Sequence, residues 1–241
     1  MNINENAAAI RAAISDSAKK AGRDPSEIKL IGVTKTVDVP RIKELLAAGV
    51  TEIGENRVQD FLPKYEEFQN SENPPSAWHF IGHLQRNKVK FIVDKVDLIH
   101  SVDSLRLAEE INRHGEKIGK KINILAEVNI AQESSKFGIP PDDVFKFVEN
   151  LAGMRFVQLQ GLMCVAPFVE NSEKNRVFFE KMRKKIIDIN ERYIYHTSME
   201  SLSMGMTGDF SVAIEEGATM VRVGTALFGA RLYQSLEQGG S

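Results

Sequence analysis

Cysteines and long apolar runs are scarce in this chain of 241 residues. The one cysteine, Cys164, excludes an intrachain disulfide and favours a reducing compartment, so we expect a cytoplasmic location. No apolar run approaches the roughly 20 residues that a membrane span needs, and the polar first residues lack the pattern of a signal peptide. The formal net charge is only −2, which gives no general attraction to nucleic acid or to an anionic membrane. We therefore expect neither a nucleic-acid partner nor a membrane partner.

Strand-like apolar runs alternate with helix-like segments along most of the chain. Hydrophobic residues make up 42% of it and charged residues 27%, a composition typical of a globular protein with one sizeable core. Eight strand-then-helix units of roughly 27 residues each predict an α/β fold, a single (β/α)8 TIM barrel. A doubly wound open sheet is the alternative, because one strand is easily miscounted from a single sequence.

We expect one domain over residues 1–241, with an additional N-terminal helix inside 1–24 and a disordered tail at 237–241. The expected strands are 28–34, 51–54, 78–81, 97–101, 122–129, 156–163, 200–204 and 219–223. The expected helices are 4–21, 39–48, 56–69, 84–94, 103–119, 141–151, 173–193, 208–216 and 225–236.

Lys35 is the most informative single residue. It follows the apolar run 28–34 and so lies at the carboxyl end of the first expected strand, where barrel proteins place their functional groups. Burial lowers the pKa of a lysine and frees its amine to form a Schiff base with a carbonyl compound. The ordinary alternative is a lysine that only reaches towards solvent from a strand end.

Two glycine-containing segments near the C-terminus favour the Schiff-base interpretation. Ser203 and Gly205 end the seventh expected strand, whereas Gly224 and Thr225 follow the eighth and begin a helix. Barrels often bind phosphate at this place, where glycine allows close approach and the N–H groups of a helix start serve as donors. A Schiff-base lysine facing a phosphate cup predicts pyridoxal phosphate as the cofactor.

Arg222 precedes the second glycine segment. On an extended strand it faces the same side as Gly224, two residues later, and there it could hydrogen-bond a ring nitrogen of the cofactor. A salt bridge to a nearby carboxylate, Glu215 or Glu216, is an equally good interpretation from the sequence.

Four other residues have simpler interpretations. Asn56 follows the second strand and is most simply the N-cap of the next helix, although it could also face the pocket. His79 and His83 are four residues apart, but the strand pattern and Gly82 break the helical face that a zinc pair needs. We therefore predict no metal site and interpret His79 as a hydrogen-bonded histidine in the barrel wall. Cys164 has no histidine or positive group near it in the sequence and is interpreted as a small buried residue.

Taken together, these residues make the chain resemble the pyridoxal phosphate homeostasis proteins. The matching stretches run in chain order from about residue 28 to residue 229, so the resemblance covers nearly the whole chain. They are Ile31-Gly32-Val33-Thr34-Lys35, Gly54-Glu55-Asn56-Arg57-Val58-Gln59, Trp78-His79-Phe80-Ile81-Gly82-His83-Leu84-Gln85-Arg86-Asn87-Lys88, His100-Ser101-Val102-Asp103, Val128-Asn129, Lys136-Phe137-Gly138, Gly161-Leu162-Met163, Leu202-Ser203-Met204-Gly205-Met206 and Val221-Arg222-Val223-Gly224-Thr225-Ala226-Leu227-Phe228-Gly229.

The resemblance implies a fold and a set of cofactor-binding residues. The fold is a barrel like the N-terminal domain of bacterial alanine racemase. Lys35 would carry pyridoxal 5′-phosphate as a Schiff base, Ser203 and the backbone of Gly224 and Thr225 would hold the phosphate, and Arg222 would face the pyridine nitrogen. Further pocket-wall residues carried over from the matching stretches are Asn56, His79, Met163, Met204 and Gly205.

The resemblance also implies a carrier that holds the cofactor without efficient catalysis, and we assign no catalytic residue. An arginine cannot accept a proton, so a ring nitrogen facing Arg222 stays neutral and the ring is a poorer electron sink. Racemisation would also need a second base, and all the tyrosines fall in expected helices or helix ends. They are Tyr65, Tyr193, Tyr195 and Tyr233. The alternatives are a low-activity amino-acid racemase and a Schiff-base aldolase.

The expected partners follow from the carrier interpretation. They are pyridoxal phosphate itself, apoenzymes that receive it, and amino acids, which can exchange with Lys35 to form an external aldimine. The protein is expected to be a monomer.

Overall fold

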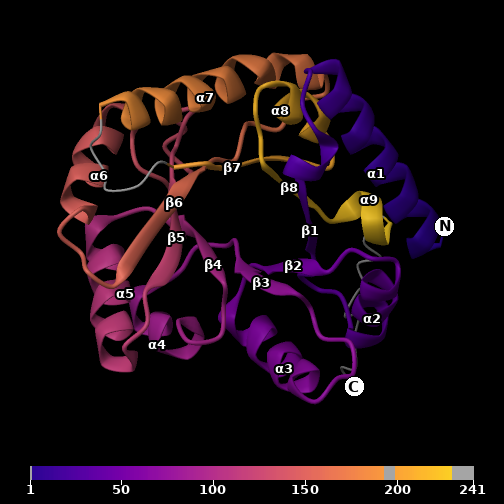
Figure 1. Cartoon of the computed structure of the whole chain (residues 1–241), viewed down its shortest axis with the longest axis horizontal. Coiled ribbons are helices and arrows are strands. Elements are labelled where there is room, and N and C mark those ends of the chain that lie inside the picture. Colours follow the sequence, from indigo (N-terminus) through magenta and orange to yellow (C-terminus); the bar gives the residue numbers. More distant parts are fainter. Residues whose placement is uncertain (1, 193–198, 230–241) are drawn as a thin grey trace, which may run out of the picture.

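The computed structural model describes residues 2–192 and 199–229. Eight parallel strands pair in chain order, and the last pairs with the first, so that the sheet closes into a barrel (Figure 1). This closure confirms the predicted (β/α)8 barrel and rules out the open sheet. The strands are β1 (Lys29–Val33), β2 (Glu52–Glu55), β3 (Ala77–Phe80), β4 (Leu98–Val102), β5 (Ile122–Glu127), β6 (Val157–Met163), β7 (Ser201–Met206) and β8 (Met220–Val223).

Helices surround the barrel and connect successive strands (Figure 1). The predicted N-terminal helix is present as α1, which packs against α2, α8 and α9. The α-helices are α1 (Ile3–Lys20), α2 (Val39–Ala47), α3 (Val58–Gln69), α4 (Val89–Ile92), α5 (Leu105–Ile118), α6 (Val144–Leu151), α7 (Arg176–Glu191), α8 (Phe210–Glu215) and α9 (Thr225–Phe228). The 3-10 helices are η1 (Pro25–Glu27), η2 (Arg86–Lys88), η3 (Pro141–Asp143) and η4 (Ser172–Asn175).

Helix α5 illustrates how the sequence specifies these outer elements. Its buried residues, among them Leu107 and Ile111, recur at a spacing of three or four and form one apolar face against the barrel. Gly119 ends the helix with a φ of 65°, a left-handed conformation that glycine adopts without a steric penalty.

Three expected boundaries differ from the structure. The helix expected at 84–94 is only η2 followed by the short α4, because the chain after β3 remains irregular up to Gln85. Asn56 is not the N-cap of α3; Arg57 holds that position, without a side-chain cap bond. The last helix, expected at 225–236, ends at Phe228, and Gly229 leaves the helical conformation with a φ of 84°. Residues 230–236, like the expected tail at 237–241, lie outside the described residues.

The core has two parts. A large apolar layer fills the space between the strands and the helices. A smaller cluster lies separately among the strands, formed by Ile31, Leu98, Leu125, Met163 and Met220. Polar side chains are buried on the strands as well, so their hydrogen bonds have to be satisfied inside the barrel. They determine what the site can do.

Candidate functional site

Lys35 lies directly after β1, at the carboxyl end of the strands. β1 pairs with β2 on one side and with β8 on the other, with Val33 opposite Gly54 and Gly32 opposite Val223. Asn56 and the Gly224–Thr225 turn therefore follow the two strands that flank β1. The barrel closure thus brings the expected Schiff-base lysine and the expected phosphate turn to the same edge, although they lie near opposite ends of the chain.

Hydrogen bonds fix the backbone on the N-terminal side of Lys35. Thr34 is fully buried, and its hydroxyl donates to Glu55 Oε1 at 2.5 Å. Lys64 of α3 donates both to that oxygen, at 2.6 Å, and to the backbone oxygen of Thr34, at 2.7 Å. Thr36 has a φ of 62°, which is costly for a β-branched residue and is found where the surrounding structure enforces it. Lys35 therefore lies between Thr34, which is fixed by hydrogen bonds, and Thr36, which has a strained backbone.

Arg222 is buried at 4% exposure. Its Nη1 donates to Ser203 Oγ at 2.5 Å, and its Nη2 donates to the backbone oxygen of Cys164 at 2.8 Å. Burial lowers the pKa of this guanidinium from its ordinary value, but arginine remains charged in proteins. A full positive charge is thus placed among neutral hydrogen-bond acceptors near the carboxyl end of β8.

The salt bridge offered as the alternative for Arg222 is not formed. Glu215 and Glu216 lie on the outside, at the end of α8, and both pair with Arg176 of α7 at 2.7 and 2.9 Å. That interpretation was wrong because the strand turns Arg222 inward, away from the helix that carries the two carboxylates.

A line of hydrogen bonds extends from Ser203 across the barrel. Ser203 Oγ lies 2.9 Å from His100 Nδ1, and His100 Nε2 lies 2.9 Å from His79 Nδ1. The other ring nitrogen of His79, Nε2, lies 3.0 Å from Glu52 Oε2. The interpretation of His79 as a hydrogen-bonded histidine of the barrel wall is confirmed. We call Glu52, His79, His100, Ser203 and Arg222 the relay.

The protonation of the relay follows from its surroundings. Burial first, and then electrostatic interaction with His79 and Arg222, lower the pKa of His100 well below its ordinary value. The hydrogen bond from His79 lowers the pKa of Glu52. At neutral pH, His100 is therefore an uncharged imidazole and Glu52 is a carboxylate.

Glu127 ends β5 near the same mouth. Burial, together with the nearby carboxylate of Asp103, raises its pKa to about 7, and Arg222 opposes this rise. Glu127 can therefore change charge near neutral pH. It also borders a cavity of about 230 Å³ with Asn129, Lys136 and Phe137.

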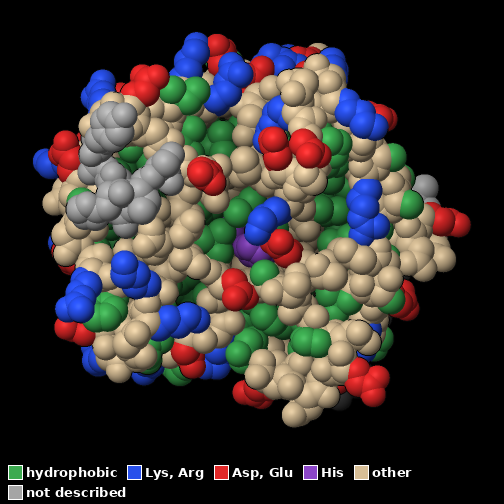
Figure 2. All heavy atoms as spheres, viewed as in Figure 1, with side chains coloured by type: hydrophobic (Ala, Val, Ile, Leu, Met, Phe, Trp, Pro, Cys, Tyr) green, Lys and Arg blue, Asp and Glu red, His purple; other side chains and the backbone are tan. Residues whose placement is uncertain are grey.

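The loop from Asn129 to Phe137 contributes much of the lining of that cavity. Asn129 Nδ2 donates to the backbone oxygen of Glu133 at 2.9 Å, which fixes the start of the loop. At the far end of the loop, the ring of Phe137 stacks on His83, with 3.7 Å between centroids. The view of Figure 2 shows that the centre of one face of the molecule is hollowed, with a histidine side chain between groups of both charge signs.

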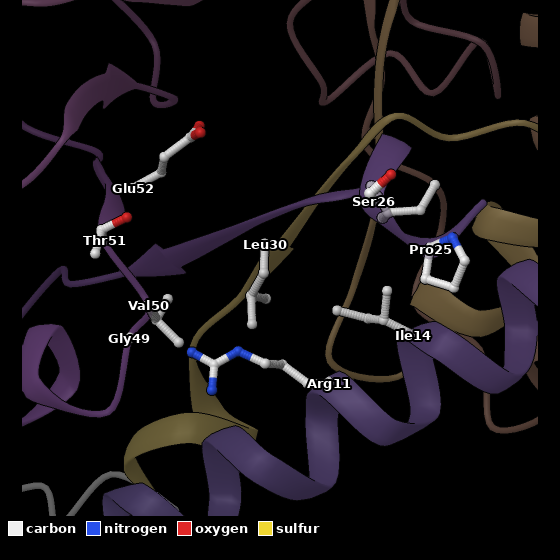
Figure 3. Close-up of a pocket in the computed structure, with 10 residues that line it drawn as sticks. Arg11, Ile14, Pro25, Ser26, Leu30, Gly49, Val50, Thr51 and Glu52 are labelled. Atoms are coloured by element: carbon white, nitrogen blue, oxygen red, sulfur yellow. The ribbon is translucent and has the colours of Figure 1, made fainter.

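A second cavity, of about 370 Å³, lies at the opposite end of the barrel, between α1 and the starts of β1 and β2 (Figure 3). Arg11 reaches from α1 towards Gly49 and donates to the backbone oxygen of Ala48 at 2.7 Å. Glu52, the last residue of the relay, also lines this cavity. The relay therefore joins one end of the barrel to the other.

The remaining predicted residues are placed as follows. Asn56 borders Lys35, and its Oδ1 is buried with no hydrogen-bond partner among the described residues. Met163 lies in the inner cluster, whereas Met204 belongs to the outer core, so any pocket role of Met204 would use its backbone. Gly205 has a φ of 89°, and a Cβ there would lie 2.6 Å from Ala213, which gives it a packing role between β7 and α8. Their cofactor contacts stay predictions.

Cys164 is fully buried, and burial raises the pKa of its thiol to about 12. The thiolate needed for nucleophilic chemistry is therefore disfavoured, in agreement with the interpretation from the sequence. Among residues 2–192 and 199–229, the structure contains no group of three or more His, Cys, Asp or Glu residues placed to hold a metal ion. Within the same ranges, no helix is long and apolar enough to cross a membrane.

Sequence reasoning assigned no role to Glu52, His100 or Glu127. The available signal was a polar side chain inside a buried strand, such as His100 in the run Leu98–Val102, because such groups are seldom buried without a partner. Their partners lie on other strands, and the sequence does not give that pairing.

Comparison with known proteins identifies the family. The family model of the alanine racemase N-terminal domain matches residues 6–232. A pyridoxal phosphate homeostasis protein of Aquifex aeolicus is 41% identical over 233 residues, which cover 97% of this chain and 100% of that protein. The protein of the same name from Escherichia coli K12 is 36% identical, over 96% of this chain and 98% of its own.

The chain belongs to the pyridoxal phosphate homeostasis family, with an alanine racemase N-terminal domain fold. The resemblance drawn from the motifs is thereby confirmed.

Solved structures agree with this family. PipY of Synechococcus elongatus, solved with pyridoxal phosphate bound, is 32% identical with a TM-score of 0.82, over 95% of this chain and 100% of its own. A protein of Bifidobacterium adolescentis has a TM-score of 0.87 at 34% identity, over 94% of both chains. An alanine racemase of Clostridium difficile is 15% identical with a TM-score of 0.69 and is covered over 60% of its length, so it shares the fold alone.

Proposed function

We propose that this protein binds pyridoxal 5′-phosphate as a Schiff base on Lys35 and serves to hold and release it rather than to turn over a substrate. The observation that carries the proposal is the position of Lys35, beside Asn56 and the Gly224–Thr225 turn at the carboxyl end of the barrel. The family name and the cofactor bound to PipY support the same ligand.

The chemistry of the site fits the cofactor. Arg222 offers a buried positive charge that donates to a hydroxyl and a carbonyl, which suits an uncharged ring nitrogen as a further acceptor. The N–H groups at the start of α9 have no partners within the helix and suit a phosphate, which Gly224 allows to approach closely. Asn56 Oδ1 offers a buried acceptor. We assign the ring contact to Arg222 and the phosphate to the Gly224–Thr225 turn, because the hydroxyl of Ser203 is already engaged with Arg222 and His100.

The same residues favour a carrier over an enzyme. Pyridoxal phosphate supplies an electron sink for carbanion chemistry, which works best when its ring nitrogen is protonated. In this proposal Arg222 faces the ring nitrogen as a hydrogen-bond donor that does not give up its proton, so the nitrogen stays unprotonated. Tyr65, the only tyrosine among the described residues, packs on Phe61 and Trp78 with centroid distances of 5.3 and 5.9 Å, so it is engaged in the outer core. The other three tyrosines lie outside the described residues.

A low-activity racemase or a Schiff-base aldolase remains the second candidate, favoured by Glu127, a carboxyl group that titrates near neutral pH at the same mouth. As a carrier, the protein would pass its cofactor to apoenzymes that depend on it.

Borohydride reduction tests the proposed attachment. The protein loaded with pyridoxal phosphate should be yellow, and reduction followed by peptide mass mapping should find the pyridoxyl group on Lys35. Lys35→Ala should lose the colour and the label, whereas Lys43→Met, an exposed lysine of α2, should keep both. A label on another lysine in the unmodified protein would overturn the assignment.

A further inference from the structure

The relay contains one hydrogen-bonded line through five strands. Its four contacts measure 3.0 Å from Glu52 to His79, 2.9 Å from His79 to His100, 2.9 Å from His100 to Ser203 and 2.5 Å from Ser203 to Arg222. Glu52 begins β2 and is 22% exposed at the cavity of Figure 3. The three groups from His79 to Ser203 are buried. The line thus starts near solvent at one end of the barrel and finishes at the guanidinium near the other.

With both imidazoles uncharged, only one arrangement of protons satisfies every contact. Glu52 is an acceptor, so His79 donates from Nε2 and accepts at Nδ1. His100 must then donate from Nε2 and accept at Nδ1, which requires Ser203 to donate its hydroxyl proton to His100. Ser203 Oγ in turn accepts from Arg222. Every donor points from Arg222 towards Glu52.

One added proton on His79 reverses the donor and acceptor roles in the two hydrogen bonds of His100. If His79 becomes an imidazolium, it donates from both nitrogens, and His100 has to accept at Nε2 and donate from Nδ1 to Ser203. The hydroxyl proton of Ser203 is then released from His100 and turns to another acceptor. The charged groups that face the line are Lys29, 3.4 Å from Glu52, and Arg222 beside His100, while Glu127 and Asp209 lie near the guanidinium.

We infer that Glu52, His79 and His100 are positioning residues, which orient Arg222 through the hydroxyl of Ser203 and transmit the charge at Glu52 to the contact between Arg222 and the cofactor ring. This inference rests on the proposed function. It gives His79 an indirect role, in place of a direct contact with the cofactor.

The experiment is a double-mutant cycle on the protein loaded with pyridoxal phosphate. Glu52→Gln removes the charge at the far end, yet its amide oxygen can still accept from His79. His100→Asn keeps an acceptor for Ser203 close to the position of Nδ1 and breaks the link to His79. The readout is the pH at which the absorbance band of the bound cofactor changes.

Glu52→Gln alone should move that pH by on the order of one unit. In the His100→Asn background the same substitution should have no further effect, because interacting sites are non-additive. Thr51→Val, in the same cavity but outside the relay, should leave the profile unchanged. Equal effects of Glu52→Gln in both backgrounds would mean that its charge acts through space alone, and would overturn the relay.

A measurement on the unmodified protein covers the case in which a variant misfolds. Nitrogen-15 chemical shifts of the histidine rings at neutral pH should place the proton of both His79 and His100 on Nε2. A proton on Nδ1 of an uncharged His100 would overturn the inference. If the unmodified protein fails to take up pyridoxal phosphate, the proposed function fails; if it is labelled on Lys35 but the cycle is additive, only the relay fails.

Discussion

Lys64 Nζ lies 2.6 Å from Glu55 Oε1, a carboxylate with a fully buried side chain directly beneath the residue that precedes Lys35. The two side chains come from α3 and the end of β2, and both also contact Thr34. This buried ion pair therefore contributes to the stability of the barrel and also fixes the backbone next to Lys35.

Removing the lysine of this pair should be strongly destabilising. Lys64→Met leaves the buried carboxylate of Glu55 unpaired, and we expect a loss of about 3 kcal/mol in the free energy of unfolding, measured by urea denaturation. Lys43→Met, whose ion pair with Glu67 is about half exposed on both sides, serves as the control and should cost less than about 1 kcal/mol. Equal losses for the two variants would show that the buried pair contributes no more to the free energy of unfolding than the exposed pair.

A side chain at position 224 should weaken phosphate binding specifically. A Cβ on Gly224 would lie 3.3 Å from the Cβ of Val33, closer than ordinary van der Waals contact, so a larger side chain should displace the backbone of the proposed phosphate turn. Gly224→Val should therefore cost on the order of 1.5–3 kcal/mol in affinity for pyridoxal phosphate and much less for unphosphorylated pyridoxal, as measured by spectroscopic titration. Gly153→Val, where an added Cβ meets nothing within 4 Å, is the control. Equal weakening of both ligands would place the phosphate elsewhere.

Glu127 should make the folded protein less stable as the pH rises. Its pKa in the folded state, about 7, lies above the ordinary value of 4.5, so the folded state holds the proton more tightly than the unfolded chain. Stability is then fully present below about pH 4.5 and falls between that pH and 7. Glu127→Gln should remove this fall and, by pH 8, gain up to about 3 kcal/mol relative to the unmodified protein.

Thermal and urea denaturation across pH 4–8 measures this difference. Glu170→Gln, on an exposed loop, should change stability by less than about 0.5 kcal/mol at each pH. An unmodified protein and a Glu127→Gln variant with parallel stability profiles would contradict the assignment.

The carrier interpretation predicts a lack of efficient turnover. Loaded protein should racemise, transaminate or decarboxylate common amino acids with a kcat below the ordinary enzyme range of about 1–10³ s⁻¹. The check combines α-proton exchange in heavy water with chiral analysis of the products. A kcat within that range for any amino acid would move the chain to the enzyme class.

The sequence predicts the parts of this molecule that are encoded locally. The barrel follows from the alternation of strand and helix patterns, and Lys35 and Gly224 are recognisable because each stands at the end of an apolar run. The shortness of α4 was not predictable, since the helical pattern around 84–94 shows no breaker after Gly82, and tertiary packing decided its length.

The polar interior could not be predicted in the same way. His100 and Ser203 are adjacent only because β4 and β7 face each other across a closed barrel, and no local pattern encodes that distance. For Arg222, the sequence left two interpretations equal; the structure excludes the salt bridge, and the contact with a ring nitrogen stays a prediction. The outward position of Glu215 and Glu216 settled which partner was wrong.

The pairing of β8 with β1 has a consequence for how the protein would acquire its ligand. Lys35 and the Gly224–Thr225 turn come to the same edge only when β8 docks on β1. A chain in which β8 has not yet docked would therefore have the proposed Schiff-base lysine without the proposed phosphate turn. Capture of the ligand would therefore wait until β8 has docked on β1. A ligand that contacts residues on both β1 and β8 binds only the closed barrel and so favours it by mass action. The ligand would therefore stabilise the pairing of β1 with β8 on which its own binding depends.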